Sequence, residues 1–144
     1  MGVGRLRVTG VALASAAALV SGCGSSSSAP SAGGNVVRIN ERDFHIAAPL
    51  QLKAGHYVFR AHNAGPDMHE LIVISTPSGK LPLRKDGFTV DEDAVTRAEA
   101  GALEPGQPGA VRDLPVTLKP GRYLLICNMA GHYVGGMRTK LVVS

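Results

Sequence analysis

Short apolar segments separated by glycine and proline turns run from residue 35 to the end of this chain, and they restrict it to an all-β fold. The alternation is clearest from Gly55 to Asn63, where Tyr57, Phe59 and Ala61 share one face. We predict strands at residues 36–39, 50–52, 55–63, 71–74, 115–118, 122–126 and 137–143. Short strands at this spacing predict a Greek-key antiparallel β-sandwich.

The stretch between Ser75 and Leu114 lacks the strand pattern. The sequence Thr89-Val90-Asp91-Glu92 has the spacing of a capping box, and Gly101 stands where a helix would end. We therefore predict one short helix in an insertion, followed by a loop at residues 104–109. The segment 77–113 is either a partner-docking insertion or only a connection, and the sequence leaves both open.

The first residues have the features of an export signal. Arg5 and Arg7 precede a short apolar stretch, residues 11–20, which is too brief to span a bilayer comfortably. The stretch ends in Leu19-Val20-Ser21-Gly22-Cys23, which resembles the lipobox of bacterial lipoproteins. The alternative is an ordinary secretory signal that happens to contain a cysteine.

The lipobox resemblance implies a domain organisation. Residues 1–22 would be a lipoprotein signal peptide, and Cys23 would carry lipid as the first mature residue. Residues 23–34 would form a flexible linker, because they contain mainly glycine and serine and nothing that offsets the entropy of ordering. We expect the domain at residues 35–144 to be extracytoplasmic and lipid-anchored to the bacterial cell membrane.

Length and charge argue against a multidomain protein and against a nucleic-acid-binding protein. A chain of 144 residues has room for one domain after its ends are trimmed, and we expect a monomer. The formal charge of +4 overstates the mature charge, because Arg5 and Arg7 lie in the segment expected to be removed. No basic patch of the kind that binds nucleic acid is evident.

The most informative run for function is Cys127-Asn-Met-Ala-Gly-His132-Tyr-Val-Gly-Gly-Met137, directly after an apolar strand. It places a thiolate, an imidazole and a thioether on one loop, a donor set that suits copper in two oxidation states. His69, directly before the strand at residues 71–74, would supply a further imidazole. A disulfide with Cys23 is the alternative for Cys127, and lipid on Cys23 would exclude it.

These residues resemble the cupredoxins, the small blue-copper proteins of the plastocyanin and azurin superfamily. The four-residue gaps on both sides of His132 are most similar to those of the rusticyanin and auracyanin kind. The resemblance implies a cupredoxin-like sandwich with one copper ion that cycles between Cu(I) and Cu(II). His69, Cys127 and His132 would be its strong ligands and Met137 its weak axial ligand.

The sequence departs from better-known cupredoxins beside two ligands. The residue after the first histidine is Glu70 rather than asparagine, and the residue after the cysteine is Asn128 rather than serine or threonine. We expect Asn63, Glu70 and Asn128 to support the ligand loops. We also predict that the Asn128 amide reaches the backbone near Glu70 and ties the two loops together.

The remaining histidines and methionines receive simpler interpretations. His45, His56 and His62 have no companion ligand, and we expect them to be solvated. Met68 and Met129 flank ligands, where they are either soft ligands for incoming copper or packing around the site. We favour packing, because methionine is a common filler of irregular gaps.

We consider three functions for this donor set. The leading hypothesis is an electron carrier that serves an unidentified redox partner protein through a small apolar patch around His132. The alternative is a copper delivery, buffering or resistance protein without an electron-transfer role. We do not expect an enzyme, because copper enzymes with related domains need a second centre with extra histidines. Zinc would leave Met137 without a purpose.

Overall fold

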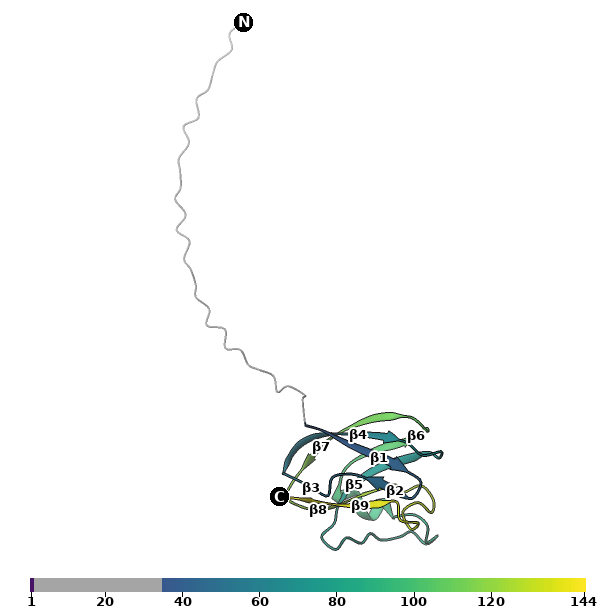
Figure 1. Cartoon of the computed structure of the whole chain (residues 1–144). Coiled ribbons are helices and arrows are strands. Elements are labelled where there is room, and N and C mark those ends of the chain that lie inside the picture. The colour runs from purple at the N-terminus through teal and green to yellow at the C-terminus, as the bar shows by residue number, and fades with distance from the viewer. Residues whose placement is uncertain (2–34) are drawn as a thin grey trace. The chain divides into compact units, whose positions relative to one another are not determined.

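The computed structural model describes residues 35–144 together with Met1 (Figure 1). The predicted signal peptide at residues 1–22, the lipidation site Cys23 and the linker at residues 23–34 therefore lie outside the described residues. Within the described part, no helix is both long enough and apolar enough to cross a membrane.

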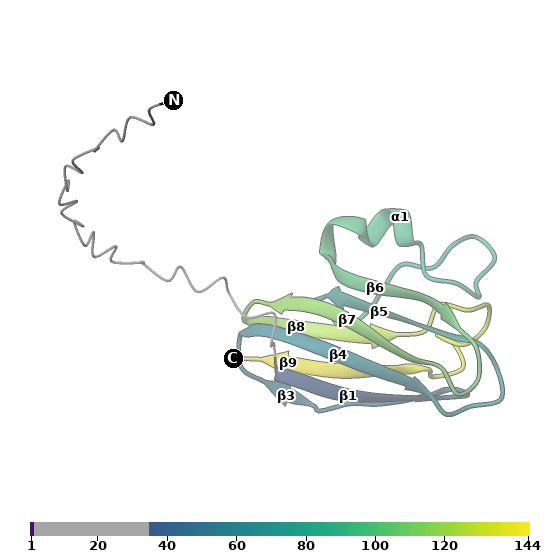
Figure 2. The ribbon, with the colours of Figure 1, turned by 90° about the horizontal axis from the view of Figure 1, so that it is seen from above.

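Two β-sheets pack face to face (Figure 2). The four-stranded sheet has the order β2-β1-β4-β7 and contains β1 (Asn35–Arg42), β2 (His45–Ala47), β4 (Gly55–Asn63) and β7 (Val111–Leu118). The five-stranded sheet has the order β3-β9-β8-β5-β6 and contains β3 (Gln51–Leu52), β5 (His69–Ser75), β6 (Glu99–Gly106), β8 (Gly121–Ile126) and β9 (Arg138–Val143). The predicted all-β sandwich is confirmed. Its sheets are mixed, because β1 pairs with β4 and β3 with β9 in parallel.

The main core fills the space between the two sheets. Phe59, Ile39, Leu125 and Leu71 are fully buried there, and the alternation predicted for β4 places Phe59 and Ala61 inside. The cluster extends without a break to Cys127 and Met137 at one end of the sandwich. The loop that carries the predicted ligands is therefore continuous with the hydrophobic core.

The insertion covers the outer face of the five-stranded sheet. It contains α1 (Glu92–Val95) and a single 3₁₀ turn, Thr96–Ala98. Val90 and Val95 pack against Ile72, Ile74 and other buried residues of β5 and β8, which form a second core. This contact explains why β5 is apolar on both faces: one face meets the four-stranded sheet and the other meets the insertion.

Three predictions within the insertion are wrong. The helix is capped by Asp91, whose side chain accepts a hydrogen bond from the Ala94 N–H at 3.3 Å, and not by Thr89. Gly101 does not stop a helix, and residues 104–106 are not loop, because β6 runs from Glu99 to Gly106. The pattern concealed this strand because β6 has few strand-forming side chains and contains Pro105. Proline is tolerated there because β6 is the edge of its sheet.

All four sheet edges are short or contain proline. β2 and β3 have three and two residues. The other two edges are β6, which contains Pro105, and β7, which contains Pro115. Proline has no N–H group to offer to a further strand.

A buried ion pair connects β1 and β7, the two strands that flank β4, near the ligand loops. Glu41 of β1 is fully buried and accepts a hydrogen bond of 2.6 Å from the Arg112 guanidinium of β7. The same guanidinium donates to the Glu104 carbonyl, and a Cβ atom at Gly106 would clash with it. Burial raises the pKa of Glu41, and the charge and hydrogen bond of Arg112 oppose that increase.

We predict that Arg112→Met destabilises the protein in a pH-dependent way. The substitution leaves Glu41 buried without a cation, which costs about 3–5 kcal/mol of unfolding free energy near pH 7. A raised carboxyl pKa means that the folded state binds the proton more tightly, so stability falls as pH rises through that pKa. The loss in the variant should therefore be smaller at pH 5 than at pH 7, as measured by urea unfolding.

The matched control is Arg60→Met, because Arg60 pairs with Asp113 on the surface, where the two side chains are 48% and 43% exposed. That variant should lose much less stability at both pH values. Equal losses in the two variants, or a loss in Arg112→Met that does not change with pH, would contradict the prediction.

Candidate metal centre

The pairing of β5 with β8 brings two of the predicted ligands together. The two strands are antiparallel neighbours in which Ile72 lies opposite Ile126. His69 is the first residue of β5 and Cys127 directly follows β8, so their side chains meet at the same end of the sheet. Both side chains are fully buried.

His132 completes a cluster with these two residues. The Cys127 Sγ atom lies 3.4 Å from Nδ1 of His132 and 4.0 Å from Nδ1 of His69. One donor atom from each of the three residues lies within 4.8 Å of the other two. Donor atoms that each lie about 2.0–2.3 Å from one ion are separated by distances of this size. Among the described residues, this cluster therefore fits a single metal ion.

Backbone hydrogen bonds hold the ligand loop between β8 and β9 closed. The Cys127 N–H donates to the Met137 carbonyl at 3.1 Å, and the Met137 N–H donates to the His132 carbonyl at 2.8 Å. Gly131 and Gly136 have φ values of 84° and 106°, which only glycine adopts readily. Met137 is fully buried at the end of this loop, so its thioether belongs to the core beside the cluster.

Burial controls the protonation of the donors. It raises the pKa of the Cys127 thiol to about 11, although the backbone N–H groups of Glu70 and Met129 oppose this effect. Burial also lowers the pKa of His69, and the nearby His132 lowers it further. The His69 imidazole is therefore neutral near pH 7 and can offer a nitrogen lone pair to a metal ion. The Cys127 thiol must lose its proton before it binds a metal ion.

Asn63 braces the loop that leads to His69. Its side-chain NH₂ group donates to the carbonyls of Asp67 and Gly106 at 2.7 and 2.9 Å, and its carbonyl accepts from the Gly65 N–H at 3.0 Å. The three bonds connect the two ends of the loop to β6. Asn63 therefore restrains the backbone of the loop that precedes His69.

Asn128 has different partners from those predicted. Its side-chain oxygen accepts from the Val90 N–H at 2.5 Å, and its NH₂ group donates to the Val90 carbonyl at 3.1 Å. The NH₂ group also donates to the Glu92 carboxylate at 2.6 Å. The prediction that this amide reaches the backbone near Glu70 is wrong. The insertion lies over Asn128, and its residues Val90 and Glu92 are the hydrogen-bond partners of the Asn128 side chain.

Glu70 lies beside this junction. Burial raises its pKa to about 7, and the neighbouring carboxylate of Glu92 adds to the increase. A hydrogen bond from the backbone of Asn128 opposes it. Glu70 and Asn128 are therefore neighbours, but the contact uses the backbone of Asn128 rather than its side chain.

Sequence reasoning missed two residues of the site, Asp43 and Phe44 in the turn between β1 and β2. The Asp43 carboxylate lies 3.1 Å from Nε2 of His69. The centre of the Phe44 ring lies 5.4 Å from that of His132. No local pattern indicates these contacts, because Asp43 precedes His69 by 26 residues.

The other histidines and methionines lie mostly where expected. His45 and His56 are exposed, as predicted, whereas His62 is partly buried. Met129 is partly buried and packs against the main core. Met68 is also partly buried, and its sulfur accepts a hydrogen bond of 3.3 Å from the Gln107 amide.

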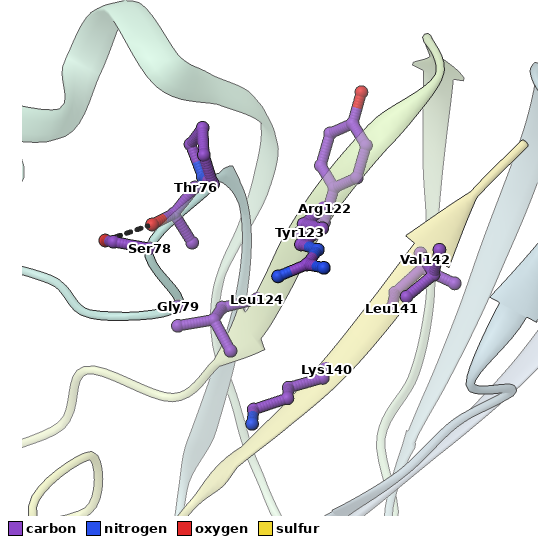
Figure 3. Close-up of a pocket in the computed structure, with 10 residues that line it drawn as sticks. Thr76, Ser78, Gly79, Arg122, Tyr123, Leu124, Lys140, Leu141 and Val142 are labelled. Atoms are coloured by element: carbon purple, nitrogen blue, oxygen red, sulfur yellow. Dashed lines mark hydrogen bonds between the residues drawn. The ribbon is translucent and has the colours of Figure 1, made fainter.

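A separate cavity of about 230 Å³ lies away from the cluster (Figure 3). The Thr76–Gly79 turn lines it on one side, and β8 and β9 line it on the other, with Arg122 and Lys140 beside Leu124. None of the predicted metal ligands lines it.

The comparisons with known proteins identify the fold. No known protein family matches the sequence, and no curated protein matches it. Solved structures do match. Reduced auracyanin from Roseiflexus castenholzii is 16% identical with a TM-score of 0.58, and the match covers 78% of this chain and 99% of that one. Auracyanin A, described as a "blue" copper protein from Chloroflexus aurantiacus, is 20% identical with a TM-score of 0.51, over 78% and 100% of the two chains.

An azurin from Methylomonas sp. strain J gives a similar result. It is 12% identical with a TM-score of 0.54, and the match covers 78% of this chain and 99% of the azurin. The chain therefore has the cupredoxin fold, as its sequence predicts. Together with this fold, the buried cysteine and two histidines form a site whose donor chemistry suits one copper ion.

We predict that Asn128→Ala loosens the insertion. The substitution leaves the Val90 N–H and carbonyl buried without partners, and each lost bond costs about 1–3 kcal/mol. Unfolding free energy should fall by about 2–6 kcal/mol, and the Val90 amide should exchange with solvent faster. Urea unfolding and hydrogen exchange measure the two effects. Asn40→Ala is the control, because Asn40 is exposed on β1, and an equal loss there would contradict the prediction.

Proposed function

We propose that the protein is a one-electron carrier with one type 1 copper site, working at the extracytoplasmic face of a membrane. The observation that carries this proposal is the buried cluster in which Cys127 Sγ lies 3.4 and 4.0 Å from the Nδ1 atoms of two histidines. Thiolate and imidazole donors with a nearby thioether suit copper more than any other common metal.

Each residue has a defined role in this proposal. Cys127 would bind copper as thiolate, His69 and His132 would bind it as neutral imidazoles, and Met137 would supply a weaker thioether donor. Bound copper supplies a couple that gains and loses one electron. The ligand loop is closed by its own hydrogen bonds and joined to the core, so the donors move little when the charge changes. A small rearrangement favours fast electron transfer.

His132 is the proposed route for electrons to and from the partner. It is partly exposed, whereas His69 and Cys127 are fully buried. Exposed apolar side chains lie on the same loop and on the segments that contact it, namely Val134, Phe44 and Phe88. A small apolar patch of this kind suits brief and weak docking of a redox partner protein.

The direction of β1 supports the proposed membrane arrangement. Asn35 begins β1, and the turn beside the cluster follows Arg42 at the other end of the strand. A strand of eight residues is about 25 Å long. A lipid anchor on Cys23 would therefore join the domain at the end away from the metal site and leave the site accessible to a partner. We propose that the carrier is monomeric.

The cluster favours a carrier over copper delivery, buffering or resistance. A site for copper as cargo needs exposed ligands that exchange readily, and two of these three are fully buried. We propose no enzymatic reaction, because a metal-bound thiolate is not free to act as a nucleophile.

We predict that the copper-loaded protein shows the spectra of a type 1 site. Thiolate ligation should give an intense visible charge-transfer band and narrow copper hyperfine splitting in electron paramagnetic resonance. Cys127→Ser should abolish the band, and Met137→Leu should retain it with a changed reduction potential. A colourless loaded protein, or a band that persists in Cys127→Ser, would refute the proposed function.

We also predict that a charge beside His132 slows electron transfer. Val134 is 42% exposed two residues after His132, so Val134→Lys places a charge in the docking patch. Electron self-exchange, measured by nuclear magnetic resonance on mixed oxidation states, should slow about tenfold through like-charge repulsion. Val142→Lys is the control, because Val142 is 45% exposed on β9 and outside the ligand loop. Equal rates in the two variants would exclude the His132 route.

A further inference from the structure

The turn between β1 and β2 has an unusual backbone. Arg42 pairs with His45, so Asp43 and Phe44 alone form the hairpin loop. Phe44 has a φ of 60°, and it is the only residue other than glycine with a positive φ in the described part of the chain. Glycine or asparagine normally occupies such positions. A strained conformation of this kind persists where the surrounding structure holds it, often at functional sites.

The first residue of the turn orients a histidine of the cluster. Oδ1 of Asp43 lies 3.1 Å from Nε2 of His69. A carboxylate only accepts hydrogen bonds, so Nε2 of His69 must carry the proton. The unprotonated nitrogen is then Nδ1, which is the atom that lies 4.0 Å from Cys127 Sγ.

A glycine makes room for this contact. A Cβ atom at Gly65 would lie 2.7 Å from Oδ1 of Asp43 and 2.8 Å from Nε2 of His69. The backbone of Gly65 is not in the left-handed region, so its conformation does not require glycine. Crowding requires it instead, from these two side chains and from the Arg42 Cα atom at 3.2 Å.

The second residue of the turn covers the other histidine. The Phe44 and His132 rings are 5.4 Å apart and tilted by 59°. The Phe44 ring also lies against Gly135, where a Cβ atom would come within 2.5 Å of Cδ1 and 2.8 Å of Cε1. Two glycines on two different loops thus leave space for the two side chains of one turn.

We propose that the Asp43–Phe44 turn positions both histidines of the metal centre, with Asp43 holding His69 in the ligating tautomer and tuning the reduction potential, and with Phe44 shielding His132. This inference rests on the proposed copper site and names the residues that set its properties. Asp43 and Phe44 are positioning residues, because both act through a histidine.

The charge on Asp43 has a defined electronic effect. A carboxylate that accepts the distal N–H of a ligating imidazole makes the other nitrogen a stronger donor. A stronger donor stabilises Cu(II) more than Cu(I). Asp43 therefore lowers the reduction potential relative to a neutral partner at the same position.

Two substitutions separate the charge of Asp43 from its hydrogen bond. Asp43→Asn keeps an acceptor oxygen and removes the charge, so the Cu(II)-to-Cu(I) affinity ratio should fall about tenfold, which raises the potential by about 59 mV. Asp43→Ala removes the acceptor, and its copper affinity should fall by about 10–100-fold.

Asp67→Asn is the matched control for charge. Asp67 is exposed and acts on His69 through its charge without a hydrogen bond to the ring. Its substitution should raise the potential by much less than Asp43→Asn does. Equal shifts in the two variants, or no shift in Asp43→Asn, would overturn the tuning role of Asp43.

A measurement without copper separates this inference from the proposed function. Nitrogen chemical shifts of the histidine rings in the metal-free protein report the tautomer of His69. The wild-type protein and Asp43→Asn should show the proton on Nε2, and Asp43→Ala should show a mixture. A mixture in the wild-type protein would overturn the positioning role, whatever the copper spectrum shows.

Removal of the Phe44 ring tests the second half of the turn. In Phe44→Ala, a chelator should extract copper about tenfold faster, because the edge of His132 becomes open to water. Phe88→Ala is the control, because Phe88 is 59% exposed and its backbone rather than its ring holds the ligand loop. Equal extraction rates in Phe44→Ala and the wild-type protein would exclude the shielding role.

Discussion

The candidate metal centre depends on the antiparallel pairing of β5 with β8. This pairing aligns Ile72 with Ile126, and as a result His69 and Cys127 arrive at the same end of one sheet, both fully buried. A shift of one residue in this register would turn every side chain of one strand to the opposite face. Such a shift would turn the His69 side chain away from Cys127, although β5 would still bury apolar side chains on both faces. The register of β5 against β8 therefore determines whether the donors meet.

The ligand loops are held from two sides by segments distant in the sequence. The insertion binds the residue that follows Cys127, through the contacts of Asn128 with Val90 and Glu92. The β1–β2 turn contacts the two histidines. The insertion was open to two interpretations from sequence, and in the structure it covers a sheet and braces the cysteine loop. Neither contact prevents the insertion from also binding a partner protein.

Local patterns predicted what local patterns can encode. The alternation in β4 and the spacing of Cys127 and His132 involve near neighbours in the chain. In the structure, the predicted face of β4 is in the core, and Cys127 and His132 lie in one cluster. The β6 strand was missed because a sheet edge accepts proline and weak strand formers, so tertiary pairing replaced local preference. The parallel pairing of β1 with β4 and the contact of Asp43 with His69 were missed for a different reason. Each joins residues about twenty or more positions apart, and no local sequence pattern at either position indicates the contact.

The sheet edges have a consequence for how this domain behaves among its own copies. An exposed strand with free N–H and carbonyl groups invites another chain to extend the sheet and begin aggregation. Here two edges, β2 and β3, are too short to template a neighbour, and prolines interrupt the donors of β6 and β7. The edges of the sandwich therefore offer few places where another chain could extend a sheet, which disfavours edge-to-edge association between copies.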